Sequence, residues 1–176
     1  NSYDKNLIRK MNDTLAHRGP DAEGIYTDDF IFLGHRRLSI IDPTEQSNQP
    51  FVSEDGRYVI VFNGEIYNYK KIRSELTDYT FKTDVDTEVV LAAYIKYKEQ
   101  CLRMFNGMFA FAIWDKVEQE LFIVRDRLGI KPLYYVLTND EIIFSSSLKS
   151  ILATNLVPAE IAKNGLVDYL RYQTVH

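Results

Sequence analysis

The sequence predicts an α+β domain in which helices and antiparallel strands pack in layers. Helical periodicity is confined to the start, the middle and the end of the chain, and β-rich runs fill most of the remainder. In the second half, four β-rich runs follow one another with short, turn-like connections such as residues 138–140. Such connections favour antiparallel pairing, because a parallel pair needs a crossover of about a dozen residues or more.

The first part of the chain combines helical and extended patterns. The first predicted helix ends before Gly19-Pro20, and one of its faces carries Leu7, Ile8, Met11 and Leu15. Strands are predicted over residues 25–26, 31–41 and 58–62, and a second helix over residues 69–76. The strand over 58–62 is predicted to stop at Asn63-Gly64, a pair that is common in turns.

The rest of the chain begins with a helix predicted over residues 87–97, which Asp86-Thr87-Glu88 is expected to cap. The four β-rich runs that follow span residues 108–114, 121–124, 133–137 and 142–144. Two further helical patterns, 148–152 and 161–170, are separated by Pro158.

Composition narrows the functional classes before any motif is considered. Lys and Arg number 21 against 25 Asp and Glu, a formal net charge of −4, so a nucleic-acid partner is not expected. The single cysteine excludes an intramolecular disulfide and favours a reducing, cytoplasmic location. The apolar runs are too short to cross a membrane. The three histidines show no metal-ligand spacing, so no metal site is predicted.

Two adjacent arginines interrupt an otherwise apolar strand. Alternation along the strand sends Arg36 and Arg37 to opposite faces, so one of them is expected to point inward. A buried guanidinium needs an anion, because an unpaired buried charge is costly. The spacing alone favours an Asp or Glu in a structural salt bridge, and the alternative is a bound ligand.

Three further polar clusters allow both a structural and a functional interpretation. The Asn63 amide and the Gly64 N–H can aim two donors at one oxyanion, although the same pair is typical of a plain turn. Capping accounts for the acidic residues that alternate at a predicted helix start: Asp84, Asp86 and Glu88. The charged loop over residues 125–131 has the composition of a surface ion-pair cluster. None of these clusters identifies a function alone.

Taken together and in order, six segments resemble one protein family. They are residues 17–21, 34–42, 62–69, 86–88, 107–112 and 125–134. The motifs His-Arg-Arg-Leu-Ser-Ile and Asn-Gly-Glu-Ile-Tyr-Asn are similar to those of glutamine-hydrolysing asparagine synthetases. These enzymes belong to the class II (N-terminal-nucleophile) glutamine amidotransferases. The resemblance covers roughly residues 9–152 and implies a four-layer αββα sandwich of antiparallel sheets, the N-terminal-nucleophile hydrolase fold.

The resemblance also implies a role for each matching residue of a glutamine pocket. Arg37 is similar to the arginine that binds the α-carboxylate, where a guanidinium fork suits a planar anion. Asp86 is similar to the carboxylate that binds the α-ammonium, and Glu65 falls near the same end. Asn63 and Gly64 match the oxyanion hole. The pocket walls match Leu38, Ile40 and Ile41, whereas His17 and His35 are expected to be structural.

The family's nucleophile is an N-terminal cysteine whose own α-amine serves as general base. Because this chain opens with Asn1-Ser2, its first strand and its nucleophile are expected to be absent, and the segment alone is expected not to hydrolyse glutamine. Cys101 is expected to be a small buried thiol. Residues 1–155 would then be the glutaminase domain, and residues 156–176 would begin a linker and helix toward an absent synthetase domain.

The implied reaction is the hydrolysis of glutamine to glutamate and ammonia, which the full-length enzyme uses for ATP-dependent amidation of aspartate. The implied partners are glutamine and a synthetase domain of the same polypeptide, and a homodimer is allowed. No cofactor is expected in this segment, whereas ATP and Mg²⁺ are implied for the synthetase domain. Two alternatives stay open: a non-catalytic domain that keeps the fold for docking or regulation, and an amidotransferase for another acceptor, such as a sugar-biosynthesis intermediate.

Overall fold

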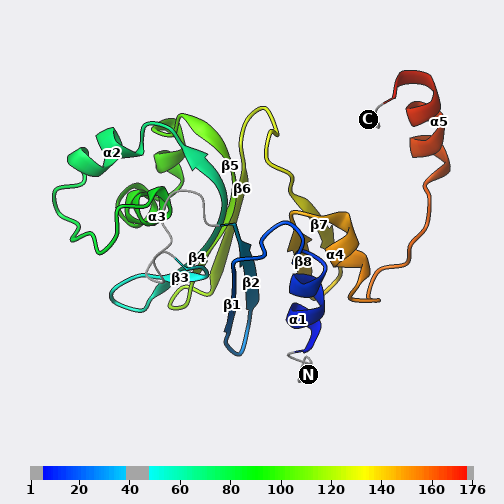
Figure 1. The fold of residues 1–176 in the computed structure, drawn as a ribbon, viewed down its shortest axis with the longest axis horizontal. Coiled ribbons are helices and arrows are strands. Elements are labelled where there is room, and N and C mark those ends of the chain that lie inside the picture. Colours follow the sequence, from blue (N-terminus) through cyan, green and yellow to red (C-terminus); the bar gives the residue numbers. More distant parts are fainter. Residues whose placement is uncertain (1–5, 39–47, 174–176) are drawn as a thin grey trace.

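The body of the molecule is built from four layers, in the order helix, sheet, sheet, helix (Figure 1). The computed structural model describes residues 6–38 and 48–173. Its helices are α1 (Asn6–Asp13), α2 (Tyr69–Glu75), α3 (Asp86–Tyr97), the 3-10 helix η2 (Lys98–Arg103), α4 (Leu148–Leu152) and α5 (Lys163–Tyr172). Its strands are β1 (Ala22–Thr27), β2 (Phe32–Arg37), β3 (Phe51–Val52), β4 (Tyr58–Ile66), β5 (Gly107–Asp115), β6 (Glu120–Arg125), β7 (Tyr134–Leu137) and β8 (Ile142–Ser145). Neighbouring strands in these ranges pair antiparallel, as the short connections predict.

The central layer is a four-stranded sheet in the order β3-β4-β5-β6. Side chains of its two long strands alternate between two environments, because successive residues of a strand point to opposite faces. Ile60 and Phe111 belong to the larger core, on the side of α2 and α3. Val59 and Trp114 belong to a smaller cluster on the side of the second β layer. The sheet is therefore covered on both faces, which explains why its central strands are nearly continuous apolar runs.

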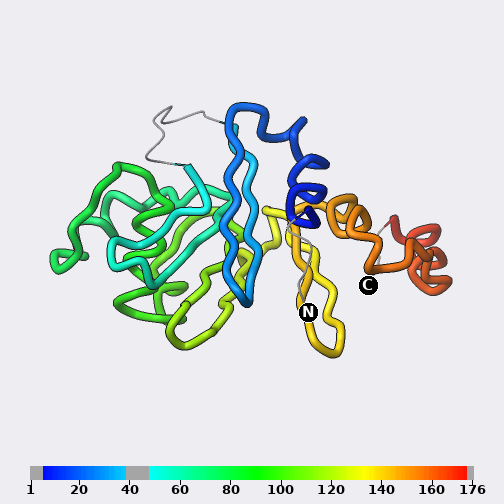
Figure 2. Tube along the Cα trace, turned by 90° about the horizontal axis from the view of Figure 1, so that it is seen from below, coloured from blue at the N-terminus to red at the C-terminus, as the bar shows by residue number. Residues whose placement is uncertain are grey.

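The second β layer consists of two hairpins, β1-β2 and β7-β8. The β1-β2 hairpin lies between the central sheet and α1 (Figure 2). Its Leu33 packs in one cluster with Val59 and Trp114. At the hairpin turn, the Asp28 carboxylate accepts hydrogen bonds from Trp114 Nε1 at 2.7 Å and from the Ile31 N–H at 2.9 Å. These contacts fix the hairpin against β5.

The outer helical layer consists of α1 and α4. The hydroxyl groups of Thr14 and Ser150 share a hydrogen bond of 2.5 Å, which joins the end of α1 to α4 across 136 residues of sequence. By contrast, α5 buries none of its residues and lies apart from the four layers in Figure 1. The helices predicted over residues 69–76, 87–97, 148–152 and 161–170 are confirmed, with their bounds shifted by a few residues.

The predicted end of a strand at Asn63-Gly64 is wrong. β4 continues to Ile66, and Asn63 and Gly64 pair with Ala110 and Phe109 of β5. A Cβ atom at Gly64 would collide with the carbonyl oxygen of Met108. Glycine therefore serves here for close approach between two strands and not for a turn.

Cys101 is fully buried in the core between the helices and the central sheet. Burial raises the pKa of its thiol to about 12; a backbone hydrogen bond opposes this rise, and the nearby charge of Glu99 adds to it. A thiol with so high a pKa is almost entirely protonated at neutral pH and is a poor nucleophile. The expectation of a small buried thiol is confirmed.

Candidate functional site

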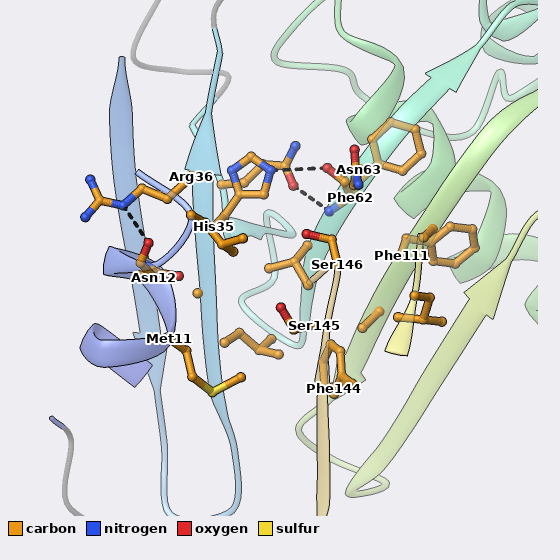
Figure 3. A pocket seen from close by; sticks show the side chains of 18 of the residues that line it. Met11, Asn12, His35, Arg36, Phe62, Asn63, Phe111, Phe144, Ser145 and Ser146 are labelled. Atoms are coloured by element: carbon orange, nitrogen blue, oxygen red, sulfur yellow. Dashed lines mark hydrogen bonds between the residues drawn. The ribbon is translucent and has the colours of Figure 1, made fainter. Parts of the chain in front are cut away.

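A cavity of about 1010 Å³ lies between the two β layers (Figure 3). Its walls come from α1, β2, β4, the start of α3, β5 and β8. On the β5 wall of this space the side chains are small, namely those of Ala110 and Ala112. The cavity brings together the predicted site residues that lie in the described ranges: Arg37, Leu38, Asn63, Gly64, Glu65 and Asp86.

One hydrogen-bonding edge of β4 faces this cavity. β3 pairs only with the first part of β4, so within the described ranges the rest of that edge has no strand beside it. The Phe62 N–H donates instead to Gln49 Oε1 at 2.6 Å. The Ile66 N–H donates to Asp86 Oδ2 at 2.9 Å. Because alternate residues of a strand direct their N–H groups to the same edge, the Gly64 N–H lies between these two and points away from β5.

The Asn63 amide complements this N–H. Asn63 stands on the same face of β4 as Val59 and Val61, the face that packs toward the second β layer. Its side chain therefore projects toward the cavity, where Figure 3 shows it opposite His35. A side-chain amide and the N–H of the next residue thus border one cavity, an arrangement that can stabilise negative charge developing on an oxygen atom.

Two carboxylates line the cavity beside the end of β4. Burial raises the pKa of Asp86, the N–H groups of Ile66 and Thr87 oppose this rise, and the nearby charge of Glu65 adds to it. A carboxylate that burial and a like charge both disfavour is stabilised by an incoming cation. This corner of the cavity therefore suits an ammonium group.

The prediction that acidic residues cap α3 is wrong. The N-cap is Val85, which makes no side-chain cap hydrogen bond. Glu88 is buried and accepts hydrogen bonds from the N–H groups of Lys82 at 2.9 Å and Thr83 at 2.7 Å. The carboxylate of Asp84 is exposed and lies 3.4 Å from the Arg73 guanidinium. Glu88 and Asp84 are thus bound by groups of the preceding loop and of α2, whereas Asp86 accepts N–H groups from both β4 and the helix start.

The two arginines of β2 are separated by strand alternation, as predicted. Arg36 forms ion pairs with Asp13 at 2.9 Å and with Glu23 at 3.1 Å. Arg37 lines the cavity, and its Nη1 donates to Asn48 Oδ1 at 2.9 Å. The structural salt bridge therefore belongs to Arg36, whereas Arg37 lies on the opposite face of β2 and contacts Asn48; both arginines are among the residues that line the cavity.

The predicted pocket walls are only partly visible. Leu38 lines the cavity and is 54% exposed. Ile40 and Ile41 lie outside the described residues, as does the last part of the strand predicted over 31–41.

Two side chains that were not predicted in the site hold the backbone of β4. His35 Nε2 lies 3.2 Å from the Phe62 carbonyl oxygen, and Gln49 accepts the Phe62 N–H. Burial lowers the pKa of His35 to about 4, the Phe62 carbonyl opposes this, and the charge of Arg37 adds to it. Alternation on β2 places His35 on the same face as Arg37, and that signal was available in the sequence. No local pattern marks Gln49, because only the fold brings it to β4.

The charged loop over residues 125–131 is not an ion-pair cluster. The Arg125 guanidinium donates to the carbonyl oxygens of Gly129 and Lys131, both at 2.7 Å. The Asp126 carboxylate accepts backbone N–H groups, including those of Ile130 and Lys131 at 2.9 Å each. Although burial alone would raise the pKa of Asp126, these backbone donors hold it below its usual value. The charges therefore shape the loop that forms part of the cavity wall.

Among residues 6–38 and 48–173, no three His, Cys, Asp or Glu side chains are grouped so that they could hold a metal ion. In the same part of the chain, no helix is long and apolar enough to cross a membrane.

Residues 1–176 match the protein family described as "Glutamine amidotransferase domain". The chain is 49% identical over 172 residues to glutamine-hydrolyzing asparagine synthetase 1 of Bacillus subtilis (strain 168), covering 96% of this chain and 27% of that protein. It is 46% identical over 167 residues to putative glutamine-hydrolyzing asparagine synthetase 2 of Methanocaldococcus jannaschii, covering 85% of this chain and 32% of that protein. Amidase chry2 of Gibberella zeae is 42% identical over 149 residues, with coverage of 83% and 22%. The chain thus spans a third or less of the length of these relatives.

The fold also matches a solved structure, that of glutamine phosphoribosylpyrophosphate amidotransferase from B. subtilis. The TM-score is 0.70 at 19% identity, and the match covers 86% of this chain and 41% of that one. The fold is therefore that of an N-terminal-nucleophile hydrolase, with antiparallel sheets between helical layers. The chain belongs to the glutamine amidotransferase domain family and is homologous to the glutaminase part of glutamine-hydrolysing asparagine synthetases.

Proposed function

We propose that the cavity between the two β layers binds L-glutamine and holds its side-chain amide for hydrolysis. The observation that carries this proposal is the convergence of a guanidinium, two carboxylates and two amide donors on one cavity. Arg37 binds the α-carboxylate, and Asp86 with Glu65 binds the α-ammonium. Recognition of both charged groups fixes how far the side chain reaches, so that the amide carbonyl lies at Asn63 and Gly64.

In the proposed reaction, a cysteine thiolate attacks the amide carbon. The C–S bond forms, the Asn63 amide and the Gly64 N–H stabilise the oxyanion, and the C–N bond breaks as the leaving nitrogen takes a proton and departs as ammonia. Water then hydrolyses the thioester to glutamate. Cys101 does not supply the thiolate, because it is fully buried in the helical core and its thiol has a pKa of about 12. The nucleophile is therefore assigned to a part of the full-length protein outside these 176 residues.

The ammonia is proposed to serve ATP-dependent amidation of aspartate in a synthetase domain of the same polypeptide. The identity with two asparagine synthetases supports this assignment. ATP and Mg²⁺ are assigned to that other domain, as the similarity to asparagine synthetases implies. A second candidate is an amidotransferase for another acceptor, because one relative of 42% identity is named an amidase and not an asparagine synthetase.

Arg37→Ala in the full-length protein tests the pocket. Loss of a charge-assisted contact is worth about 1.5–3 kcal/mol, so the KM for glutamine is expected to rise roughly tenfold to a hundredfold. Amidation driven by added ammonium salt should be unchanged, because it bypasses the glutamine pocket. Glutamate release and amide formation, each assayed over a range of glutamine or ammonium concentrations, measure the two effects.

Arg36→Ala is the matched control, because Arg36 is the neighbouring arginine on β2 but its guanidinium is engaged in ion pairs with Asp13 and Glu23. It should lower thermal stability and leave the KM for glutamine unchanged. Equal changes in KM from both variants would remove Arg37 from the binding site. A full-length protein without a cysteine at its mature N-terminus, and without a glutamine-dependent thermal shift, would instead favour the non-catalytic docking domain.

A further inference from the structure

The backbone N–H and C=O groups of Phe62 lie at the open edge of β4, and a different side chain contacts each of them. Gln49 Oε1 accepts the N–H at 2.6 Å, and His35 Nε2 contacts the carbonyl oxygen at 3.2 Å. Figure 3 shows His35 beside Phe62, with this contact as a dashed line. Along the first part of β4 the neighbouring strand β3 satisfies such groups, but β3 stops before it reaches Phe62. Two side chains from two other segments thus replace a missing strand.

We propose that His35 and Gln49 are positioning residues that clamp β4 and thereby set the orientation of the oxyanion donors Asn63 and Gly64. The proposal deepens the proposed function and rests on it. Asn63 and Gly64 directly follow the clamped residue, so a change in the backbone dihedral angles of Phe62 would turn both donors. Donors of this kind act only if they lie within hydrogen-bond distance of the place where the oxyanion forms.

Gln49 also couples the oxyanion donors to the proposed ammonium site. Its Nε2 donates to Thr87 Oγ1 at 3.4 Å, and Thr87 follows Asp86 at the start of α3. One amide side chain therefore spans the distance between β4 and α3. The preceding residue, Asn48, accepts a hydrogen bond from Arg37, so the same short segment also contacts the proposed carboxylate site.

The sequence of β1 allows Gln49 to approach the second β layer closely. A Cβ atom on Gly24 of β1 would collide with the Gln49 carbonyl oxygen. Glycine at that position therefore allows residue 49 to lie directly against the second β layer, where its side chain reaches β4. This close approach is independent of the hydrogen bonds of the Gln49 side chain.

His35 makes a specific hydrogen bond and does not merely fill space between the β layers. A carbonyl oxygen only accepts, so Nε2 carries the proton and Nδ1 carries the lone pair. Nδ1 is buried and has no hydrogen-bond partner among the described residues. An unsatisfied buried acceptor costs stability, which a methionine of similar length would avoid. The imidazole of His35 therefore provides the Nε2 contact to Phe62, although its unsatisfied Nδ1 lowers the stability of the fold.

The test compares four variants of the full-length protein. Gln49→Met and His35→Met remove the contacts at similar side-chain length. His35→Gln keeps an N–H donor at the same reach. Gln100→Met is the control, because Gln100 is exposed on η2. We expect kcat for glutamine hydrolysis to fall about tenfold to a hundredfold in the two clamp variants, because displacements near 1 Å cost up to ~100-fold. The glutamine KM should stay within about threefold, since the binding groups are untouched. His35→Gln and Gln100→Met should retain the wild-type kcat.

Two further readouts separate positioning from folding. Ammonia-driven amidation should be unchanged in every variant. Hydrogen exchange of the Phe62 amide should accelerate at least about tenfold in Gln49→Met, because its acceptor is gone, whereas exchange in α3 stays protected.

Unchanged kcat in both clamp variants would overturn the proposal. So would equal losses of glutamine-driven and ammonia-driven activity, which would assign the two residues a structural role. A wild-type protein that hydrolyses no glutamine would overturn the proposed function, and the positioning role with it, whatever the Phe62 amide shows. Hydrolysis by the wild type together with unaffected clamp variants would overturn the positioning role alone.

Discussion

Arg36 and Arg37 are covalent neighbours with different tasks. Arg36 points toward α1, where it contacts the Asn12 carbonyl oxygen and pairs with two carboxylates, one of them from the facing strand β1. Arg37 lines the cavity between the β layers. The period of two along a strand is the whole reason for this division. A single residue's role here thus follows from its place in the strand and not from its type.

His35 predicts a specific pH dependence of stability. Its pKa is lowered from 6.5 to about 4 in the folded state, so below pH 6.5 the unfolded state binds the proton more readily. The folded state should therefore lose free energy of unfolding as the pH falls from 6.5 toward 4, by up to about 3 kcal/mol, and should keep it above pH 6.5. Urea unfolding of the wild type and of His35→Gln at several pH values measures the difference.

The difference between the two proteins isolates His35, because the raised pKa of Asp86 acts with the opposite sign in both of them. In His35→Gln the slope between pH 4 and 6.5 should be shallower than in the wild type. Parallel pH profiles would show that His35 is not buried as a neutral imidazole.

At the scale of elements, β4 shows how long-range pairing overrides a local pattern. Asn-Gly is common in tight turns, so the strand was expected to end there. The pairing with β5 instead continues through Asn63 and Gly64 to Ile66. Because β3 is short, the far edge of β4 stays open, and side chains of His35, Gln49 and Asp86 bind it. Because this edge is open, backbone N–H groups of β4 are available as hydrogen-bond donors to other groups.

The loop that follows β6 depends on one carboxylate. Asp126 accepts N–H groups from residues 109, 128, 130 and 131. Asp126→Asn places an amide N–H₂ against some of these donors, so we expect a loss of about 2–3 kcal/mol in the free energy of unfolding. Asp140→Asn, at an exposed turn position, should change it by less than about 0.5 kcal/mol. Chemical denaturation of both variants checks this, and similar values would mean that Asp126 does not organise the loop.

At the scale of the molecule, the central sheet separates two different interiors. On one side, α2 and α3 pack against it in a dense core that contains most of the aromatic contacts. On the other side, small residues and a looser packing of the two hairpins leave the cavity. The dense side therefore supplies stability, and the open side supplies the site.

Phe111→Ala tests this division. Phe111 is 2% exposed in the dense core, so its truncation should cost about 3–5 kcal/mol in the free energy of unfolding. Phe30→Ala is the matched control, because Phe30 is 66% exposed at the hairpin turn and should cost about 1 kcal/mol or less. Urea-unfolding midpoints measure both, and a small effect at Phe111 would contradict the assignment of the dense core.

Much of the fold follows from the sequence because its signals are local. Apolar periodicity located α2, α3 and the β5-β6 hairpin, and short connections predicted antiparallel pairing. The ordered motifs pointed to the family and to Arg37, Asn63, Gly64, Glu65 and Asp86, which one cavity does bring together. Their individual roles stay predictions, as does the boundary at residue 155.

Only the tertiary structure decided which of two adjacent arginines forms the ion pairs with Asp13 and Glu23, why β4 continues past Asn63-Gly64, and which acidic side chains bind distant backbone. Gln49 is the clearest example, because it lies 13 residues from Phe62 and carries no pattern of its own, yet it holds the strand that bears the oxyanion donors. Local sequence fixes which elements form, since helix and strand periodicity act over a few residues. The partners of an open strand edge are fixed by packing between layers, and the sequence carries no short-range signal for them.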